Sequence, residues 1–560
     1  MRRPWLEHYD SAVPKSLAPY PDKTLVDLLD DLASRQGERA ALLFKGATMS
    51  YRRLHEESNA FAAALVTLGI GGGERVALLL PNCPQFLVCQ FGIWKAGGIV
   101  VALNPTYSER EIEQALDTMR ASAVVTLTPF YERVTRVQAR TGVRHVIATS
   151  IKEYLPAATR VLFTLFREKK DGHRITLRAD HLWLKDLLRR HRQSAAPTSR
   201  PAPDDPAVIL SSGGTTGTPK GVVGAHRHYV AAGLQLLEWT KSAKRPDDVI
   251  MLPLPLFHVY ANVGVQPLAF VGPNPLSLVP NPRDIDDLLK TIAQVRPAFF
   301  NGVPTLYAAI LNHRRVREGK IDLSSIKLCF SGAAALMADT KRQFEEKTGA
   351  TIIEGYSLTE AMMACCVNPV KGVRKVGSIG MPLPDIDVLI VDAEDPSREL
   401  GTGEVGELIM HAPQSMSEYW NNPVETREAL RTRGDGRVWL HTGDLAYLDE
   451  DGYVFLVDRK KDLIKTSGFQ VWPREIEEVL SAHPAIREVG VAGVPDPIKG
   501  EVAQAWVVLH AGASATEEEL RHYCRERLAP YKVPVRVVFR AELPKTTVGK
   551  ILRRALSTTT

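Results

Sequence analysis

Short apolar runs alternate with amphipathic segments through the first 150 residues. Leucines and alanines recur at helical spacing on both sides of the apolar run 41–44, which predicts two helices around a strand. A helix is expected at about 84–95. Further buried strands are predicted at 76–80, 99–103, 123–125 and 145–147. Such alternation predicts a largely parallel sheet covered by helices.

The pattern changes twice in the second half of the chain. From about residue 377 it consists of short alternating segments with frequent glycines, and the charged stretch 458–462 follows them. The last hundred residues mix helical and strand segments. We therefore expect an α/β fold with three parts: a large N-terminal domain over 1–458 of mostly parallel sheets, which includes a small β-rich subdomain at about 377–457; a hinge at 459–462; and a small, mobile α+β domain over 463–560.

Composition is that of an ordinary globular protein. The 560 residues exceed what one core usually supports, and 44% hydrophobic with 24% charged residues argues against a disordered or fibrous chain. The net charge of +6 is small for this length and gives no indication of nucleic-acid binding. A mildly basic chain would suit an anionic substrate.

Cysteine usage and the lack of an apolar leader favour the cytoplasm. The six cysteines form no C-x-x-C pair, so neither a disulfide framework nor a zinc site is indicated. Cys365 and Cys366 follow a candidate binding motif, and we hypothesise that they confer sensitivity to thiol reagents. The longest charge-free run, 249–282, carries seven prolines, which argues against a membrane-spanning helix.

The segment 151–191 combines apolar residues with a basic run. Arg167, Lys169, Lys170 and Arg174 follow the apolar stretch 161–166. Basic amphipathic segments lie on membrane surfaces in some proteins and pack on the protein body as solvated helices in others. Peripheral contact with a membrane therefore stays open at this stage, as does the choice between a monomer and a homodimer.

One glycine- and hydroxyl-rich stretch, 211–221, follows the predicted strand 207–210. Glycines allow the backbone to approach a ligand closely, and hydroxyls with a lysine offer donors to phosphate oxygens. The stretch is not a Walker A loop, because Gly221 follows Lys220 where that motif needs Ser or Thr. We predict a phosphate-binding loop, with a flexible linker as the alternative. Its candidate contacts are Ser212, Gly213, Gly214, Thr215, Thr216, Gly217, Thr218 and Lys220.

Five further motifs accompany this loop. They are Pro255-Leu256-Phe257-His258, Gly355-Tyr356-Ser357-Leu358-Thr359-Glu360, His441-Thr442-Gly443-Asp444, Asp458-Arg459-Lys460-Lys461-Asp462 and Pro544-Lys545-Thr546-Thr547-Val548-Gly549-Lys550. In this order, and over nearly the whole chain, they resemble the motifs of the adenylate-forming superfamily, which comprises acyl-CoA synthetases, firefly-type luciferases and peptide-synthetase adenylation domains. The stretches 104–111 and 467–477 resemble those of bacterial long-chain fatty acid–CoA ligases in particular.

The resemblance implies a two-step ligase reaction. A fatty acid carboxylate attacks the α-phosphorus of ATP to give acyl-AMP and pyrophosphate, and the thiol of CoA then displaces AMP. Since the substrates supply both nucleophiles, the protein needs only to neutralise charge and to position the reactants. The substrates would be small molecules, namely a fatty acid, ATP with Mg²⁺ and CoA, and no nucleic acid would be bound.

The resemblance also assigns roles to residues. Tyr356 would pack on adenine, Asp444 and Arg459 would contact the ribose, and Lys550 would reach the α-phosphate. Glu360 and Thr216 would hold Mg²⁺, and His258 would line the carboxylate end of the acyl site, with a buried core histidine as the alternative. Further ATP contacts would come from Gly332, Ala333, Ala334, Gly355, Ser357 and Thr359. The acyl and CoA sites would include Tyr260, Gly302, Gly468 and Phe469. The small domain would swing about Lys461.

Three alternatives remain at this stage. The substrate could be a medium-chain, aryl or hydroxycinnamic acid instead of a long-chain acid. The acyl-AMP could be passed to a carrier protein, although the chain has no appended carrier domain. The chain could also be an inactive ATP-binding or scaffold relative, against which its intact charged motif residues argue.

Overall fold

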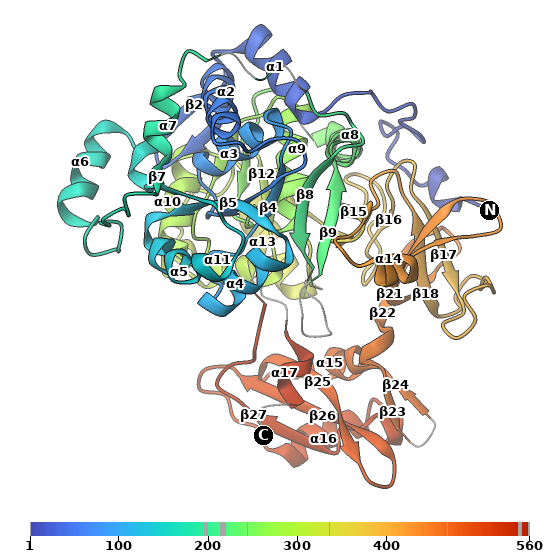
Figure 1. Cartoon of the computed structure of the whole chain (residues 1–560). Coiled ribbons are helices and arrows are strands. Elements are labelled where there is room, and N and C mark those ends of the chain that lie inside the picture. The colour runs from blue at the N-terminus through green and yellow to red at the C-terminus, as the bar shows by residue number, and fades with distance from the viewer. Residues whose placement is uncertain are drawn as a thin grey trace.

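Figure 1 shows the computed structural model of the chain, in which a large α/β body is followed by a smaller C-terminal domain. The structure describes residues 2–194, 197, 200–212, 220–243, 245–334, 336–466, 469–546 and 551–557. The chain passes from the body to the small domain after β22 (Val454–Arg459). This mixed α/β architecture confirms the predicted fold class.

One large sheet carries the predicted phosphate loop. Its strands β4, β3, β5, β6, β7 and β8 run parallel, whereas β9 runs antiparallel to β8 and β19 antiparallel to β9. In spatial order the strands are β19 (Glu418–Tyr419), β9 (Gly221–Ala225), β8 (Pro206–Ser211), β4 (Ile99–Ala102), β3 (Arg75–Leu79), β5 (Ala121–Leu127), β6 (His145–Thr149) and β7 (Leu182–Trp183).

The second large sheet has a parallel centre and antiparallel ends. Its strands in spatial order are β16 (Met381–Pro382), β15 (Met363–Val367), β14 (Thr351–Leu358), β13 (Leu328–Ser331), β12 (Phe299–Gly302), β10 (Ile250–Leu252), β11 (Leu276–Leu278), β1 (Ala40–Phe44) and β2 (Ala47–Ser50). Because β10, β12, β13 and β14 are parallel, their carboxyl ends share one edge, where open α/β sheets bind ligands.

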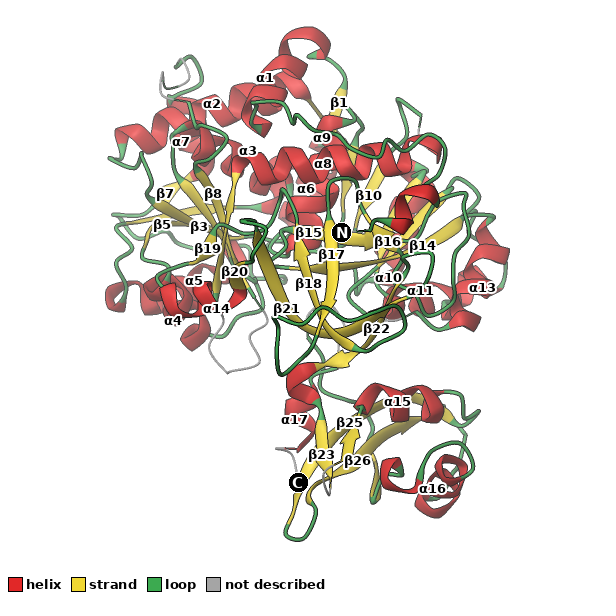
Figure 2. Ribbon diagram, turned by 90° about the vertical axis from the view of Figure 1, so that its right-hand side faces the viewer, coloured by secondary structure: helices red, strands yellow, loops and turns green. Residues whose placement is uncertain are grey.

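Helices fill the space between these sheets and cover their outer faces. All twelve residues of α3 (Pro84–Lys95) are buried, as expected for a helix without a polar face. Trp94 of α3 packs 5.1 Å from Tyr229 of α8 (His226–Thr240), and its indole donates to the carbonyl of Ala207 in β8. Figure 2 shows α3 and α8 between the two sheets. The other helices of the body are α1 (Leu25–Gln36), α2 (Tyr51–Thr67), α4 (Glu109–Thr118), α5 (Tyr131–Val137), α6 (Ala157–Phe166), α7 (Leu184–Arg190), α9 (Gln266–Val271), α10 (Ile285–Val295), α11 (Pro304–Asn312), α12 (Arg314–Arg317), α13 (Ala338–Thr348) and α14 (Pro423–Ala429).

Two smaller sheets complete the chain. The β-rich part consists of β17 (Asp387–Val391), β18 (Gly406–His411), β20 (Leu430–Thr432), β21 (Val438–Leu448) and β22. The C-terminal sheet consists of β23 (Ile464–Thr466), β24 (Phe469–Val471), β25 (Ile486–Asp496), β26 (Gly500–Leu509) and β27 (Arg536–Phe539). Three helices pack with it: α15 (Pro473–Ser481), α16 (Glu517–Arg525) and α17 (Arg553–Ser557).

The basic amphipathic segment packs on the body only in part. Helix α6 projects from the edge of the large domain and has no buried residue. The following α7 does bury Leu184 and Leu187. Within the described part of the chain, no helix is long and apolar enough to cross a bilayer.

Candidate functional site

The predicted phosphate loop connects the antiparallel strands β8 and β9. Ser211 pairs with Gly221, and the backbone N–H of Ser212 donates to the carbonyl of Lys220 at 2.8 Å, so the base of the loop is closed. The predicted contacts between these ends lie outside the described residues: Gly213, Gly214, Thr215, Thr216, Gly217 and Thr218.

Lys220 is linked to the predicted metal ligand through residues that the sequence analysis missed. Its ammonium forms an ion pair with Glu425 of α14 and lies 5.0 Å from the centre of the Tyr419 ring. The hydroxyl of Tyr419 donates to Glu360 Oε1 at 2.8 Å. Tyr419 reaches this position because β19 pairs with β9, a contact between segments far apart along the chain for which the sequence carries no local signal. Lys220, at the end of the predicted phosphate loop, and Glu360 therefore lie on either side of Tyr419.

The ends of three parallel strands bring several predicted nucleotide contacts together. Gly302 of β12 lies opposite Ser331 of β13, which lies opposite Glu354 of β14. Ala333, just beyond β13, has a left-handed backbone with φ of 68°, so the chain turns sharply at this edge. The predicted residues that this edge gathers are Gly332, Ala333, Ala334, Gly355, Tyr356, Ser357 and Thr359.

Three predicted nucleotide-binding residues are in direct contact. The hydroxyl of Tyr356 donates to Asp444 Oδ2 at 2.6 Å, and Arg459 Nε lies 3.2 Å from Asp444 Oδ1. Burial opposes the charged form of Arg459, but Asp444 raises the pKa of its guanidinium above the usual range. Asp444 itself is buried. The structure thus joins residues of β14, β21 and β22 into a single polar cluster.

A buried carboxylate supports the turn that carries Asp444. Glu407 Oε1 accepts from the N–H of Gly443 at 3.2 Å and lies 3.5 Å from His441 Nδ1, while its Oε2 lies 3.5 Å from Lys460 Nζ. Burial raises the pKa of Glu407, but His441 and Lys460 outweigh it, so the net pKa is lowered. The lowered pKa favours the charged form of Glu407, which would hold the turn in place. The sequence analysis did not single it out.

His258 is half-buried beside an aromatic ring. Its ring is 5.0 Å from that of Phe257, and burial lowers the pKa of the imidazole to about 4. The imidazole is therefore neutral near pH 7, so it would orient a carboxylate by hydrogen bonding and would not attract it by charge.

Two of the predicted acyl-site residues, Tyr260 and Gly302, make close packing contacts. Tyr260 opens a π-helical turn over Tyr260–Val265, and a Cβ on Gly332 would lie 3.1 Å from its Cε1. Tyr260, predicted for the acyl site, is therefore a direct neighbour of Gly332, predicted for the nucleotide site. A Cβ on Gly302 would lie 2.9 Å from Tyr307 Cζ, so this glycine makes room for a buried ring.

Some predicted residues cannot be placed in the site. Lys550 and Gly468 lie outside the described residues. Phe469 begins β24 and Lys461 lies in the short 3-10 turn Lys460–Asp462, but only their backbones are described.

Comparison with known proteins identifies the family. The AMP-binding enzyme model matches residues 29–420, and the model of the AMP-binding enzyme C-terminal domain matches residues 475–550. The chain belongs to the AMP-binding enzyme family. This AMP-binding enzyme is therefore an adenylate-forming enzyme, as its motifs predicted.

Relatives of this AMP-binding enzyme span its full length. A long-chain-fatty-acid–CoA ligase of Bacillus subtilis is 39% identical over 556 residues, which cover 99% of this chain and 98% of the relative. A protein of the same name from Escherichia coli O157:H7 is 38% identical with the same coverage. Among solved structures, the anthranilate CoA ligase AuaEII in complex with anthranoyl-AMP is 28% identical with a TM-score of 0.82, covering 96% of this chain and 97% of that one.

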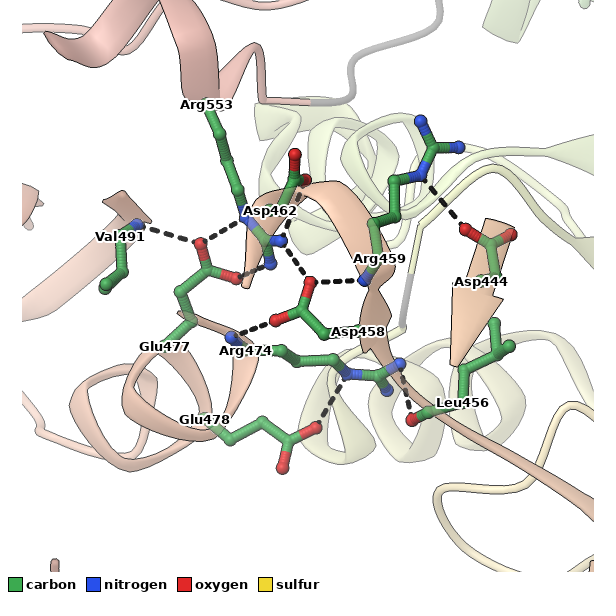
Figure 3. A network of polar contacts seen from close by, with 10 residues as sticks. All are labelled: Asp444, Leu456, Asp458, Arg459, Asp462, Arg474, Glu477, Glu478, Val491 and Arg553. Carbon is green, nitrogen blue, oxygen red and sulfur yellow. Dashed lines mark hydrogen bonds and ion pairs between the residues drawn. The ribbon is translucent and has the colours of Figure 1, made fainter. Parts of the chain in front are cut away.

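In the AMP-binding enzyme, a network of charges crosses the predicted hinge (Figure 3). Asp458, before the hinge, accepts from Arg553 Nη1 of α17 and, at 2.8 Å, from the backbone N–H of Arg474. Arg553 Nη1 also lies 3.3 Å from Asp462, and its Nη2 donates to Glu477 at 2.7 Å. Burial opposes the charge, but Glu477 and Asp458 raise the pKa of Arg553. Rotation of the small domain about 459–462 would have to break the contacts made by Asp458.

The cysteines of the AMP-binding enzyme are poorly placed to react. All six are buried and free, and burial raises the pKa of Cys365 to about 12 and that of Cys366 well above its usual range. Because the thiolate is the reactive form, burial argues against the thiol sensitivity expected from the sequence.

We therefore expect iodoacetamide at pH 7.5 to leave the ligase activity of the folded enzyme unchanged. Mass spectrometry should find essentially no label on the folded protein and six labels after unfolding in guanidinium chloride. Activity loss in step with labelling of Cys365 or Cys366 would contradict this expectation.

Proposed function

We propose that this chain is an ATP-dependent fatty acid–CoA ligase that prefers long-chain acids. It would convert a fatty acid, ATP and CoA into acyl-CoA, AMP and pyrophosphate through an acyl-adenylate. The observation that carries the proposal is the contact of Asp444 with Tyr356 and Arg459, in a family member with full-length relatives named long-chain-fatty-acid–CoA ligase.

The first half-reaction needs the nucleotide to be fixed by its base, its sugar and its phosphates. Tyr356 would pack on adenine, and Asp444 would exchange its present partners for the ribose hydroxyls, with Arg459 contacting the same sugar. Lys220 and the loop over 212–220 would hold the β- and γ-phosphates, so that the leaving pyrophosphate is neutralised. Such preorganised donors act on charge as it develops in the transition state.

Glu360 suits the magnesium ion that accompanies ATP. A hard cation takes oxygen ligands and usually keeps several waters, so one carboxylate beside the phosphate loop is sufficient. Together with the predicted Thr216, Glu360 would hold Mg²⁺, which when bound neutralises charge on the phosphates. Glu360 is connected to the loop through Tyr419 and Lys220, which supports this placement.

The acyl group would lie beside His258 and Tyr260, and CoA would approach through Gly468 and Phe469. In the structure, the β23–β24 hairpin points away from the large domain, whereas α15 and α17 face it (Figures 1 and 2). We infer that this arrangement corresponds to the adenylate-forming half of the cycle. The small domain would then rotate about Lys461 to bring residues 467–469 to the site.

The long acyl chain of the proposed substrate also affects where in the cell the enzyme would meet it. Each buried methylene contributes about 0.8 kcal/mol, so long-chain acids accumulate in membranes. We propose a cytoplasmic enzyme that makes peripheral contact with a membrane surface, where its substrate is concentrated.

The test is ATP–pyrophosphate exchange with the purified enzyme and acids of graded length, repeated with CoA to follow thioester formation. Exchange should be strongest with acids of about twelve to eighteen carbons, and AMP release should require CoA. Preference for a benzoate or cinnamate would favour the aryl alternative, to which the likeness to AuaEII gives some support. Exchange without CoA-dependent AMP release would favour a carrier-protein acceptor, and no exchange with any acid would favour an inactive relative.

A further inference from the structure

Helix α6 exposes an unusual amount of apolar surface. Val161, Leu162, Leu165 and Phe166 are 58%, 57%, 69% and 70% exposed, and the helix buries no residue. It projects from the edge of the large domain in Figure 1. Scattered exposed apolar residues are normal, but four large ones within six positions form a contiguous patch of the kind that marks an interaction surface.

The exposed apolar residues share one face of α6. Because residues four apart are neighbours on a helix surface, the pairs Val161–Leu165 and Leu162–Phe166 form a single stripe. The opposite side contacts the body: the half-buried Phe163 packs 5.2 Å from His173, and Arg160 donates to the carbonyl of Leu155 at 3.2 Å. The apolar stripe is therefore directed outward, while α6 is anchored through its other side.

Cations border this stripe. The segment 157–174 contains Arg160, Arg167, Lys169, Lys170 and Arg174 against two acidic residues. Both acids are already paired within the chain, Glu168 with Lys152 at 2.6 Å and Asp171 with Arg167 at 2.7 Å. In the described residues, Lys169, Lys170 and Arg174 make no ion pair with an acidic side chain. The stripe is thus flanked by uncompensated positive charge.

We propose that α6 docks this enzyme on the surface of an anionic lipid bilayer, with the stripe inserted at the headgroup–acyl boundary and the cations among the headgroups. A helix of ten residues is about 15 Å long, too short to span a bilayer but suited to lying in its interface. A second copy of the chain is the less suitable occupant, because two α6 segments packed face to face would bring their cations together. The inference rests on the proposed function, because docking would bring the enzyme to a fatty acid substrate that partitions into the membrane.

Vesicle co-sedimentation tests the proposal on the full-length protein. Wild type should bind vesicles of phosphatidylglycerol and phosphatidylcholine and should bind pure phosphatidylcholine much more weakly. L165S/F166S should bind the anionic vesicles at least tenfold more weakly, because two large side chains lose their insertion. K169Q/K170Q should lose about tenfold on anionic vesicles, and high salt should reproduce that loss.

The matched control is V376S/I498S, which replaces two other apolar side chains that are 90% and 91% exposed and lie outside α6. This variant should bind vesicles like wild type. Wild type that does not bind anionic vesicles, or α6 variants that bind equally well, would overturn the proposal. So would an L165S/F166S protein whose solution mass, by sedimentation equilibrium without lipid, is half that of wild type, because α6 would then be a contact between copies.

The two proposals can fail separately. Without vesicles, all these variants should activate a water-soluble shorter acid at the wild-type rate, because α6 contacts none of the described site residues. Vesicle binding without any acid activation would leave the docking inference standing and would remove the proposed function.

Discussion

Lys550→Ala is expected to slow acyl-adenylate formation on the order of 10²–10³-fold, while thioester formation from supplied acyl-AMP should be nearly unchanged. Loss of one preorganised donor to developing charge costs about 3–4 kcal/mol. A lysine ammonium is a compact point charge that can contact the α-phosphate and the attacking carboxylate oxygen together. Pyrophosphate exchange measures the first half-reaction, and AMP release from synthetic acyl-AMP and CoA measures the second.

The base of the loop that carries Lys550 is well defined. Lys545 and Ile551 form a β-bridge, and the N–H of Leu552 donates to the carbonyl of Pro544 at 2.8 Å. Helix α17 follows at once and is held to the hinge by Arg553. The described residues on the two sides of this loop therefore lie together in the small domain, directly before α17.

Lys545→Ala is the matched control, since it removes a lysine from the same loop. The ammonium of Lys545 is 2.8 Å from Glu488 within the small domain and would not reach the nucleotide. Exchange by this variant should stay within about threefold of wild type. Near-wild-type exchange by Lys550→Ala, or an equal loss in the control, would remove the role proposed for Lys550.

Lys461→Pro is expected to impair the second half-reaction far more than the first. Proline restricts φ to a narrow, helix-compatible range, which the short turn Lys460–Asp462 tolerates, but it would resist the backbone rotation that carries the small domain to its other position. A backbone conformation that proline cannot adopt costs ~3 kcal/mol, which corresponds to a loss on the order of 10²-fold in thioester formation. Exchange should fall by less than about threefold.

The contacts around the turn explain why Lys461→Pro should spare the first half-reaction and impair the second. Asp458 already fixes the present arrangement through Arg553 and Arg474, so a proline at 461 would leave that arrangement intact. Lys461→Ala removes the same side chain but keeps the rotation, and it should support both half-reactions. Equal losses in both half-reactions for the proline variant, or a stalled alanine variant, would contradict a hinge at Lys461.

Local pattern predicted much of the fold. A helix was predicted at about 84–95, and the structure has α3 there, buried at every position. The strand before the predicted phosphate loop was predicted for the same reason, because the periodicities of helices and strands depend on near neighbours. The motif residues Tyr356, Asp444 and Arg459 were predicted from their resemblance to a family, and the structure brings them into contact.

Site residues that come from segments far apart along the chain could not be predicted from the sequence. Tyr419 contacts Glu360 because a short strand, β19, pairs with β9, which lies far from it along the chain. Glu407 supports the turn at Gly443 only because β18 and β21 are adjacent strands. In each case the partner is set by long-range strand pairing, which leaves no mark on the local sequence.

The sequence by itself determined the class of elements and their order, because residue type and short-range spacing carry that information, and the resemblance of its six motifs to those of a family determined which chemistry to expect. Only the tertiary structure decided which charges meet across the hinge, that Cys365 and Cys366 are buried, and that α6 turns its apolar stripe outward. The physical reason is that burial and pairing depend on what the rest of the chain places opposite each residue. An apolar stripe looks the same in sequence whether it faces a core or solvent.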